Sequence, residues 1–200
     1  MEEFKEYCNS LGSTNPTPGG GSAAALGLSL GASAAEKAVR FSLNEYLEEF
    51  LNSFTEIKEA GFILSEEDQS AFNNWMEARK LPKSTPEEKS IRENKINFFA
   101  REAILVPYQI AKRSIRLLEI IQDFIPHCNK WLLSDLAVGG AFAKSSFDGS
   151  IFNVYINFPY LKDVELYEEI NEFIEERVGY AAKITENIYR LCKINLSKKD

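Results

Sequence analysis

Apolar residues recur at helical spacing through the middle and the C-terminal part of the chain. The first stripe consists of Val106, Ile110, Ser114, Leu117 and Ile121, and the second of Leu166, Ile170, Phe173, Ala181, Ile184, Ile188 and Leu191. Spacings of three and four residues place side chains on one face of an α-helix. The stripes therefore predict two long helices that each pack along one face, the second over residues 163–191.

Residues that favour helix ends define the limits of the first of these helices. Thr85 is a good N-cap, Pro86 suits the first helical position, and Glu88 completes a capping box three residues after the cap. A long helix is therefore predicted to begin at Pro86. Pro107 should kink this helix and Pro126 should end it, because proline lacks the N–H that an interior position donates.

The N-terminal half is also helical in pattern. Ser22 precedes a run of alanines and predicts a helix over residues 22–42. A second helix is predicted over residues 44–60, with Gly61 as its left-handed C-terminal cap. A sequence similar to a capping box at Ser65 predicts a third, which ends near Lys80.

The remaining pattern predicts an all-α fold in one domain over residues 1–200. A helix should begin between Lys130 and Ser134, whereas residues 150–159 alternate enough to form a short strand and could equally be helical. No repeat or linker divides the chain. A length of 200 residues with 44% apolar positions is enough to bury a core of ordinary size.

The charge balance argues against two classes of partner. Asp and Glu number 30 against 23 Lys and Arg, which gives a formal net charge of −7. A surface that binds nucleic acid or an anionic membrane needs a basic face. We therefore expect neither nucleic acid nor a membrane as a partner.

Cysteine and histidine are too sparse for a disulfide framework or a metal site. Cys8, Cys128 and Cys192 form no close pair, and His127 is the only histidine. The N-terminus is acidic where a signal peptide is basic, and the uncharged run at residues 23–35 is shorter than a membrane span. We expect a cytoplasmic protein that binds no metal.

The segment from Asn15 to Ala25 is the strongest candidate for ligand binding. Prolines stiffen its approach, consecutive glycines let backbone N–H groups turn toward a ligand, and the helix that follows adds its partial positive charge. The combination suits an anion or the polar edge of a ring. A flexible entry to a closely packed helix would explain it equally well. The candidate binding residues are Pro18, Gly19, Gly20, Gly21 and Ser22.

Ordered blocks along the chain resemble a known family. They are PTPGGGSAAA at residues 16–25, Asp68-x-x-Ala71-Phe72, Ala78-x-x-Leu81-Pro82-Lys83 continuing to Arg92, Ala103-x-x-Val106-Pro107, Asn129 with Ser134-Asp135, and Asn153-Val154-x-Ile156-Asn157. Over roughly residues 5–190 the chain resembles the cyclodeaminase domain of the formiminotransferase-cyclodeaminase family, which also contains stand-alone methenyltetrahydrofolate cyclohydrolases.

The resemblance implies an up-and-down helical bundle that forms a homodimer. By the same resemblance residues 150–159 are helical, with Asn153 and Asn157 on one face. The implied substrate is a tetrahydrofolate derivative that carries a one-carbon unit between N5 and N10, with no cofactor beyond the folate itself. The implied reactions are loss of ammonia from 5-formiminotetrahydrofolate, or interconversion of 5,10-methenyl- and 10-formyltetrahydrofolate.

Asp135 and Lys83 are the candidate catalytic residues on the matched pattern. A carboxylate with a raised pKa can transfer the proton that either reaction needs, or can hold the edge of the pterin ring. Asp135 could instead be an ordinary residue of a first helical turn. Lys83 and Arg92 would balance negative charge in the pocket or meet the glutamate tail of folate, although such residues usually form a solvated helix face.

Asn153 and Asn157 join Arg92 as candidates for substrate binding, with buried amides that bond between helices as the alternative. Because the domain stands alone, we favour the cyclohydrolase reaction. The competing hypothesis is a folate-binding or assembly module without turnover, since Glu36, Lys37 and Arg40 interrupt an otherwise small and apolar helix. A purely structural bundle ranks last, because it leaves the triple-glycine segment unexplained.

Overall fold

The described part of the chain is helical throughout. The computed structural model describes residues 1–42 and 47–197, without the side chain of Leu47. Its α-helices are α1 (Glu2–Leu11), α2 (Gly20–Arg40), α3 (Leu47–Lys80), α4 (Pro86–Phe124), α5 (Leu133–Asn157) and α6 (Val164–Leu196). Short 3₁₀ helices lie at Ile125–His127, Lys130–Leu132 and Phe158–Tyr160. No strand occurs in these residues, which confirms the all-α prediction.

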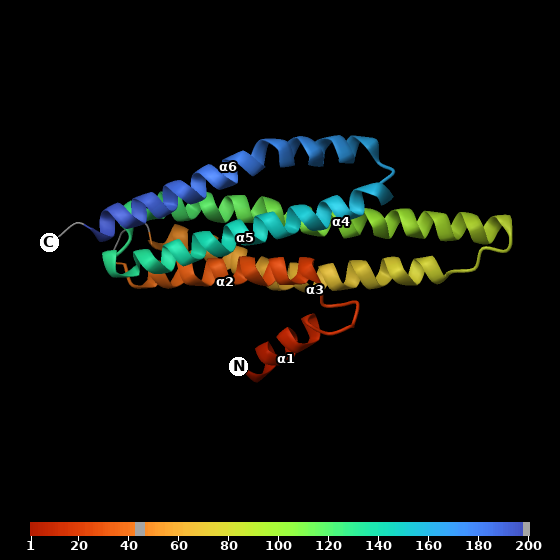
Figure 1. Cartoon of the computed structure of the whole chain (residues 1–200), viewed down its shortest axis with the longest axis horizontal. Helices are drawn as coiled ribbons and strands as arrows, with labels where there is room; N and C mark the ends of the chain where they lie inside the picture. The colour runs from red at the N-terminus through yellow and green to blue at the C-terminus, as the bar shows by residue number, and fades with distance from the viewer. Residues whose placement is uncertain (43–46, 198–200) are drawn as a thin grey trace.

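Consecutive long helices run in alternating directions, as an up-and-down bundle requires (Figure 1). α2 packs mainly against α3 and α5, and α4 packs against the same two helices from the other side. α6 lies on the outside, against α5 and α4. The C-terminal part of α3 and the N-terminal part of α4 extend together beyond the other helices (Figure 1).

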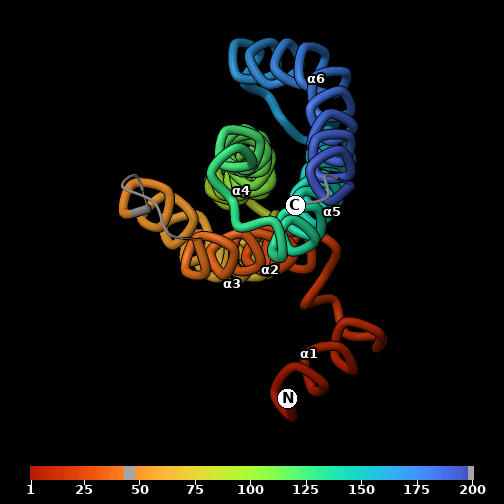
Figure 2. The backbone as a smooth tube through the Cα atoms, turned by 90° about the vertical axis from the view of Figure 1, so that its left-hand side faces the viewer, coloured from red at the N-terminus to blue at the C-terminus, as the bar shows by residue number. Residues whose placement is uncertain are grey.

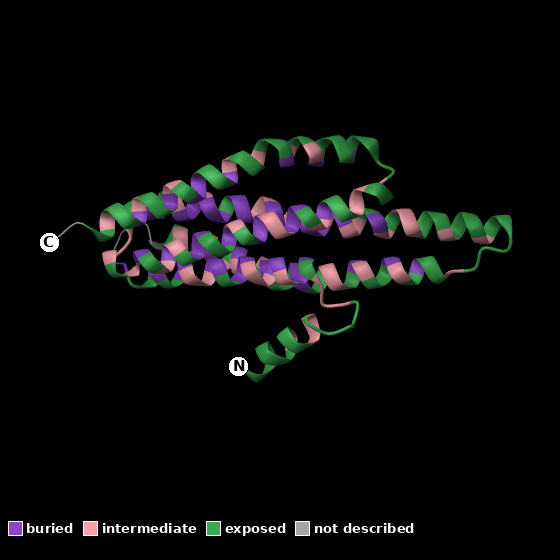
Figure 3. Cartoon of the chain, viewed as in Figure 1, coloured by how far each residue is buried: buried purple, intermediate pink, exposed green. Residues whose placement is uncertain are grey.

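The core runs along the centre of the bundle, where the stripe that the sequence predicted in α4 is buried (Figure 3). Fully buried side chains from every helix of the bundle meet there, among them Leu28, Phe54, Leu117, Phe147 and Ile170. None of the described helices combines the length and the apolar character that crossing a bilayer demands.

The predicted limits of α4 are confirmed. Thr85 accepts a hydrogen bond from the backbone N–H of Glu88, whose carboxylate accepts one from the N–H of Thr85. The helix then runs without interruption through Pro107 and ends before Pro126. Pro107 therefore does not end the helix, as predicted.

Two predicted helix boundaries are wrong. α3 continues through Gly61, which the sequence suggested as a C-cap, and through Ser65, where a separate helix was predicted to begin. Asn44, the predicted start of the first of these helices, lies outside the described residues. A Cβ on Gly61 would lie 2.7 Å from the carbonyl oxygen of Ala25 and closer still to Oγ of Ser29. Gly61 is therefore a point of close approach between α3 and α2.

Residues 150–159 are helical up to Asn157, as the family resemblance implied. α6 is confirmed over the predicted residues 163–191, with Asp163 as its N-cap. α2 begins at Gly20, two residues before the predicted start, and Gly19 is its N-cap.

The charged residues of α2 pair with neighbouring helices. Buried Glu36 accepts hydrogen bonds from Arg40 and from Lys58 of α3. Burial opposes ionisation, but these bonds lower the pKa of Glu36. Lys37 pairs with Asp135 at 2.9 Å. These charges therefore belong to helix packing.

The helix α1 was not expected from the sequence and projects from the bundle (Figure 2). None of its residues is buried, although Phe4, Tyr7, Cys8 and Leu11 share one face at helical spacing. Tyr7 links it to the bundle, because the Tyr7 hydroxyl lies 2.9 Å from Oγ of Ser22.

Candidate functional site

A cavity of about 440 Å³ opens where α2 begins. We call it the glycine-turn pocket. Five segments surround it: the turn into α2, the C-terminal part of α3, one position of α4, the end of α5, and the 3₁₀ helix that follows α5. Its lining consists of Pro16, Thr17, Gly19, Gly20, Gly21, Asp68, Phe72, Trp75, Met76, Arg79, Ala103, Asn153, Ile156, Asn157 and Tyr160.

Gly21 and Asp68 are in close contact at the N-terminus of α2. A Cβ on Gly21 would lie 2.6 Å from Cγ of Asp68 and 2.8 Å from its Oδ2, and closer still to Oδ1. The backbone N–H of Ser22 donates a hydrogen bond to this carboxylate. Since Gly19 offers no side chain to cap α2, Asp68 supplies from α3 the acceptor that the first turn lacks. The glycine permits this approach.

Asp68 has the electrostatic setting of a proton-transfer group. Burial raises the pKa of its carboxyl, and the hydrogen bond from Ser22 opposes the rise only in part. Desolvation of this kind stabilises the protonated form of a carboxyl. A group so perturbed in a cavity can take up and release a proton during a reaction.

Asn153 and Asn157 present acceptors to the same cavity. Nδ2 of Asn153 donates to the carbonyl of Gly149 at 2.8 Å, and Nδ2 of Asn157 donates to Ala103 and Asn153 carbonyls at 3.0 and 2.9 Å. Asn157 thus uses both of its amide N–H groups and Asn153 uses one, while both side-chain oxygens are left to accept hydrogen bonds. These oxygens suit a ligand edge rich in N–H donors.

Aromatic side chains form the far wall of the pocket. The Trp75 and Tyr160 rings meet edge to face with centroids 5.0 Å apart, and the ring centroid of Phe72 lies 6.4 Å from that of Trp75. The guanidinium carbon of Arg79 lies 4.7 Å from the Trp75 ring centroid. This end of the cavity therefore combines flat apolar surface with one positive charge.

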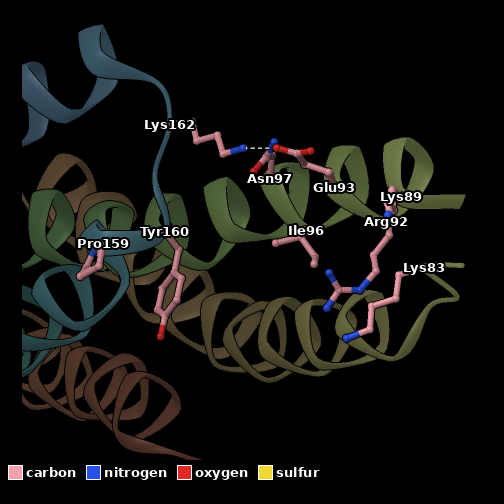
Figure 4. A pocket seen from close by; sticks show the side chains of 9 residues that line it. All are labelled: Lys83, Lys89, Arg92, Glu93, Ile96, Asn97, Pro159, Tyr160 and Lys162. Atoms are coloured by element: carbon pink, nitrogen blue, oxygen red, sulfur yellow. Dashed lines mark hydrogen bonds and ion pairs between the residues drawn. The ribbon is translucent and has the colours of Figure 1, made fainter. Parts of the chain in front are cut away.

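A second cavity, of about 510 Å³, lies between Tyr160 and the N-terminal part of α4, with Lys83 of the loop before α4 also in its lining (Figure 4). We call it the basic pocket. Its charged lining residues are Lys83, Lys89, Arg92, Glu93 and Lys162. Figure 4 shows Lys83 and Arg92 reaching into one space, while Lys162 pairs with Glu93 on the other side of α4.

The two cavities adjoin at one shared residue. Tyr160 lines both of them. The Arg92 guanidinium donates two hydrogen bonds, of 3.3 and 3.1 Å, to the carbonyl oxygen of Arg79. An extended ligand could thus occupy the glycine-turn pocket with one end and present an anionic end to the basic pocket.

This arrangement agrees with the relationships of the sequence. A sequence profile of the formiminotransferase-cyclodeaminase family matches residues 3–176. The chain belongs to the formiminotransferase-cyclodeaminase family. It spans about a third of the relative from Gallus gallus, a formimidoyltransferase-cyclodeaminase with 30% identity over 84% of this chain and 32% of its own length.

Two further relatives match this chain over nearly their whole length. The methenyltetrahydrofolate cyclohydrolase of Methylorubrum extorquens is 26% identical over 96% of both chains. The crystal structure of formiminotetrahydrofolate cyclodeaminase from Thermotoga maritima superimposes with a TM-score of 0.78 at 24% identity, covering 96% of this chain and 94% of that one. The latter likeness shows that the bundle is shared.

The backbone conformation of the glycine turn differs from the one expected from the sequence. No glycine among the described residues has a positive φ. Gly20 and Gly21 are helical residues of the first turn of α2, and the absence of a side chain there leaves space for neighbouring residues. Pro18 and Ser22 do not line the cavity. Ser22 is buried behind the turn, where its hydroxyl lies 2.7 Å from that of Ser65.

Asp135 is the predicted site residue that the fold separates from the others. It lies in the first turn of α5, whereas Asn153 is near the end of that helix, about 27 Å further along its axis. Asp135 pairs with Lys37 there. Within one chain it therefore meets neither the glycine turn nor Lys83 and Arg92, which line the basic pocket.

Sequence reasoning did not select three charged or aromatic residues that line the cavity, namely Asp68, Trp75 and Arg79. Asp68 is the fourth residue of the sequence at Ser65 that was interpreted as similar to a capping box, although it stands four residues after buried Leu64 and three before buried Ala71. A carboxylate on the buried stripe of a helix is the signal that was available. Trp75 lies one turn beyond Ala71 on the same stripe, and Arg79 one turn beyond Trp75.

Proposed function

We propose that this chain is a folate-dependent one-carbon enzyme that hydrolyses 5,10-methenyltetrahydrofolate to 10-formyltetrahydrofolate. The pterin would lie in the glycine-turn pocket, where Asn153 and Asn157 offer acceptors to the donors of its 2-amino-4-oxo edge. Support comes from the Methylorubrum extorquens relative, which carries the name of this activity and matches 96% of both chains.

The reaction needs a base beside the one-carbon unit, and we assign that role to Asp68. Its carboxylate takes a proton from water as the water oxygen bonds to the methenyl carbon. The C–N5 bond of the resulting carbinol then breaks, with its electron pair passing to N5. N5 gains a proton as the hydroxyl loses one, so that the reaction consumes one water and releases one proton overall.

The position of the Asp68 carboxyl in the lining of the glycine-turn pocket, where burial raises its pKa, is the observation that carries this assignment. Asp68→Asn keeps the shape and an acceptor for the Ser22 N–H but removes proton transfer. We expect the hydrolysis rate to fall by about 10²–10⁴-fold, the usual contribution of general acid–base catalysis. The assay follows the methenyl chromophore under conditions where spontaneous hydrolysis is slow.

Glu66→Gln is the matched control, since Glu66 is an exposed carboxylate on the same helix. Its rate should equal that of the wild type. If Asp68→Asn folds and hydrolyses methenyltetrahydrofolate at the wild-type rate, Asp68 is not the base. If the wild type acts at the blank rate, the hydrolase proposal fails.

The pH profile gives a second test. A base must be ionised, so the rate should rise as pH increases through the raised pKa of Asp68. The inflection should lie above the ordinary pKa of an aspartic acid and should be lost in Asp68→Asn. A rate that decreases over this range would identify a protonated group as the essential form.

Formiminotetrahydrofolate cyclodeaminase is the second candidate activity, favoured by the name of the 30% identical Gallus gallus relative. In that reaction the protonated form of Asp68 would donate to the departing amine. Ammonia release from 5-formiminotetrahydrofolate tests it directly, and the acid limb of its pH profile should have the opposite sign. Folate binding without either turnover would indicate a binding module instead.

We further propose that Lys83 and Arg92 contact the glutamate tail of the substrate, because the basic pocket adjoins the glycine-turn pocket at Tyr160. Arg92→Gln should raise KM for the folate substrate and leave kcat unchanged. A fall in kcat with constant KM would contradict a role in tail binding.

We also propose a homodimer, as the resemblance implied. α5 exposes Val138, Phe142, Phe152 and Ile156 on one face, and no residue on the apolar face of α1 is fully buried by its own chain. Self-complementary apolar faces suit a two-fold interface. Sedimentation should give a dimer that Phe152→Glu disrupts and that Phe62→Glu, an exposed phenylalanine of α3, leaves intact. A wild-type monomer would refute it.

A cytoplasmic location is consistent with this proposal, because all three cysteines are free thiols and reducing compartments preserve thiols.

A further inference from the structure

Trp75, Tyr160 and Arg79 form an aromatic and cationic surface where the glycine-turn pocket meets the basic pocket. The Trp75 and Tyr160 rings meet edge to face at 5.0 Å, and the Arg79 guanidinium lies 4.7 Å from the Trp75 centroid. All three residues line the glycine-turn pocket, and Tyr160 also lines the basic pocket. The proton-transfer role of Asp68 makes no use of this surface.

The Trp75 indole carries an unused donor. Trp75 is buried, and its Nε1 is one of two buried polar side-chain atoms that find no hydrogen-bond partner within the described chain. A buried N–H without an acceptor is unfavourable, and a ligand that brings an acceptor relieves this cost. Tryptophan is a donor only, so the complementary ligand atom must be an acceptor such as a carbonyl oxygen.

The spacing along α3 indicates which part of a folate would reach this surface. Trp75 follows Asp68 by seven residues and Arg79 follows it by eleven, which correspond to rises of about 10 Å and about 16 Å along the helix. A pterin, a short methylene-amino bridge, a benzoyl ring and a carboxylate follow one another in the same order. With the pterin at Asp68, the benzoyl ring would arrive beside Trp75 and the first carboxylate beside Arg79.

We infer that Trp75, Tyr160 and Arg79 form the subsite for the p-aminobenzoylglutamate half of the substrate. This inference rests on the proposed function. The benzoyl ring packs on the Trp75 and Tyr160 rings, Nε1 of Trp75 donates a hydrogen bond to the benzoyl carbonyl, and the guanidinium of Arg79 pairs with the first carboxylate. The subsite selects folates over free pterins.

Two probes separate the halves of the ligand. The first is 5-formyltetrahydrofolate, and the second is 5-formyl-6-methyltetrahydropterin, which lacks the benzoylglutamate. Trp75→Phe keeps an aromatic ring and removes the N–H. We expect it to weaken binding of the full folate by about tenfold in calorimetry and to leave pterin binding unchanged. In turnover it should raise KM and leave kcat unchanged, because Trp75 is remote from the reacting carbon.

Trp131→Phe is the matched control. It replaces the other tryptophan of the chain, which is 77% exposed and lies before α5, and it should change neither affinity. It also leaves Trp75 as the sole tryptophan, so that quenching of its fluorescence by the folate and not by the pterin would report contact directly.

Arg79→Gln tests the carboxylate contact, with exposed Lys80→Gln as its control. We expect about a tenfold loss for the folate and none for the pterin from Arg79→Gln, and no loss from Lys80→Gln. Circular dichroism should show equal thermal unfolding of the Arg79 variant and the wild type. Loss that is equal for both probes, or absent for the folate, would overturn the subsite. A wild type that binds the folate no more tightly than the pterin would also overturn it, whereas a wild type that binds neither probe would remove the proposed function itself.

Discussion

Gly21→Ala distinguishes two reasons for a glycine in this turn: it leaves space for a neighbouring side chain, or it adopts a backbone conformation that other residues avoid. Gly21 is helical and has no positive φ, so alanine meets no backbone strain there. Its Cβ would, however, lie 2.6 Å from Cγ of Asp68 and 2.8 Å from Oδ2, where no real Cβ fits. Asp68 must therefore move away from the start of α2.

The expected cost follows from the bond that is lost. A hydrogen bond to a charged group contributes about 1.5–3 kcal/mol, and alanine gains at most about 1 kcal/mol over glycine in helix propensity. We therefore expect Gly21→Ala to lower the free energy of unfolding by about 0.5–2 kcal/mol. Displacement of the proposed base should lower the hydrolysis rate by about 10²-fold or more.

Gly20→Ala is the matched control one residue earlier. Its Cβ would lie 3.5 Å from Nδ2 of Asn153, an ordinary contact. Unfolding in urea and the methenyl absorbance assay should both give values for this variant close to the wild type. Equal stability and equal rates for the two alanine variants would refute the assignment of Gly21 as the residue that admits Asp68.

Three smaller predictions test the rest of the fold. Gly61→Ala should destabilise the protein by about 1–3 kcal/mol in urea unfolding through overpacking against α2, whereas Gly179→Ala, with open space around it, should stabilise it slightly. Asp135→Asn breaks only its ion pair with half-exposed Lys37, so both stability and turnover should change little. Burial raises the pKa of the other two thiols to about 12 and about 11, so a thiol reagent at pH 8 should modify exposed Cys8 alone in the folded protein.

Local signals in the sequence predicted the helices that local signals control. The capping box at Thr85 is built from residues three apart, so its effect could be read directly. Gly61 gave the opposite result, because its role depends on Ser29 and Ala25, more than thirty residues away. A glycine that ends a helix and a glycine that admits a neighbouring helix are identical in a single sequence.

The site was predicted in part for the same reason. The glycine turn, Asn153 and Asn157 were expected together and do line one cavity. Asp68 was not singled out, because its importance arises from contact with the start of α2, which only the packing of α3 on α2 creates. Asp135 matched the family pattern, but position in a pattern does not give distance along a helix.

The carboxyl of Asp68 closes the N-terminus of α2 and also holds an exchangeable proton. Its raised pKa means that the native fold favours the neutral acid more than the unfolded chain does. The contribution of this group to the free energy of unfolding is therefore present at low pH and is lost as pH rises through the raised pKa. A permanently neutral amide at this position should make the fold more robust in neutral solution while silencing turnover. Selection for stability and selection for catalysis therefore act in opposite directions on the Asp68 carboxyl. Variants of this protein selected for higher thermal stability should be checked first for substitutions at Asp68 and for the activity that these would remove.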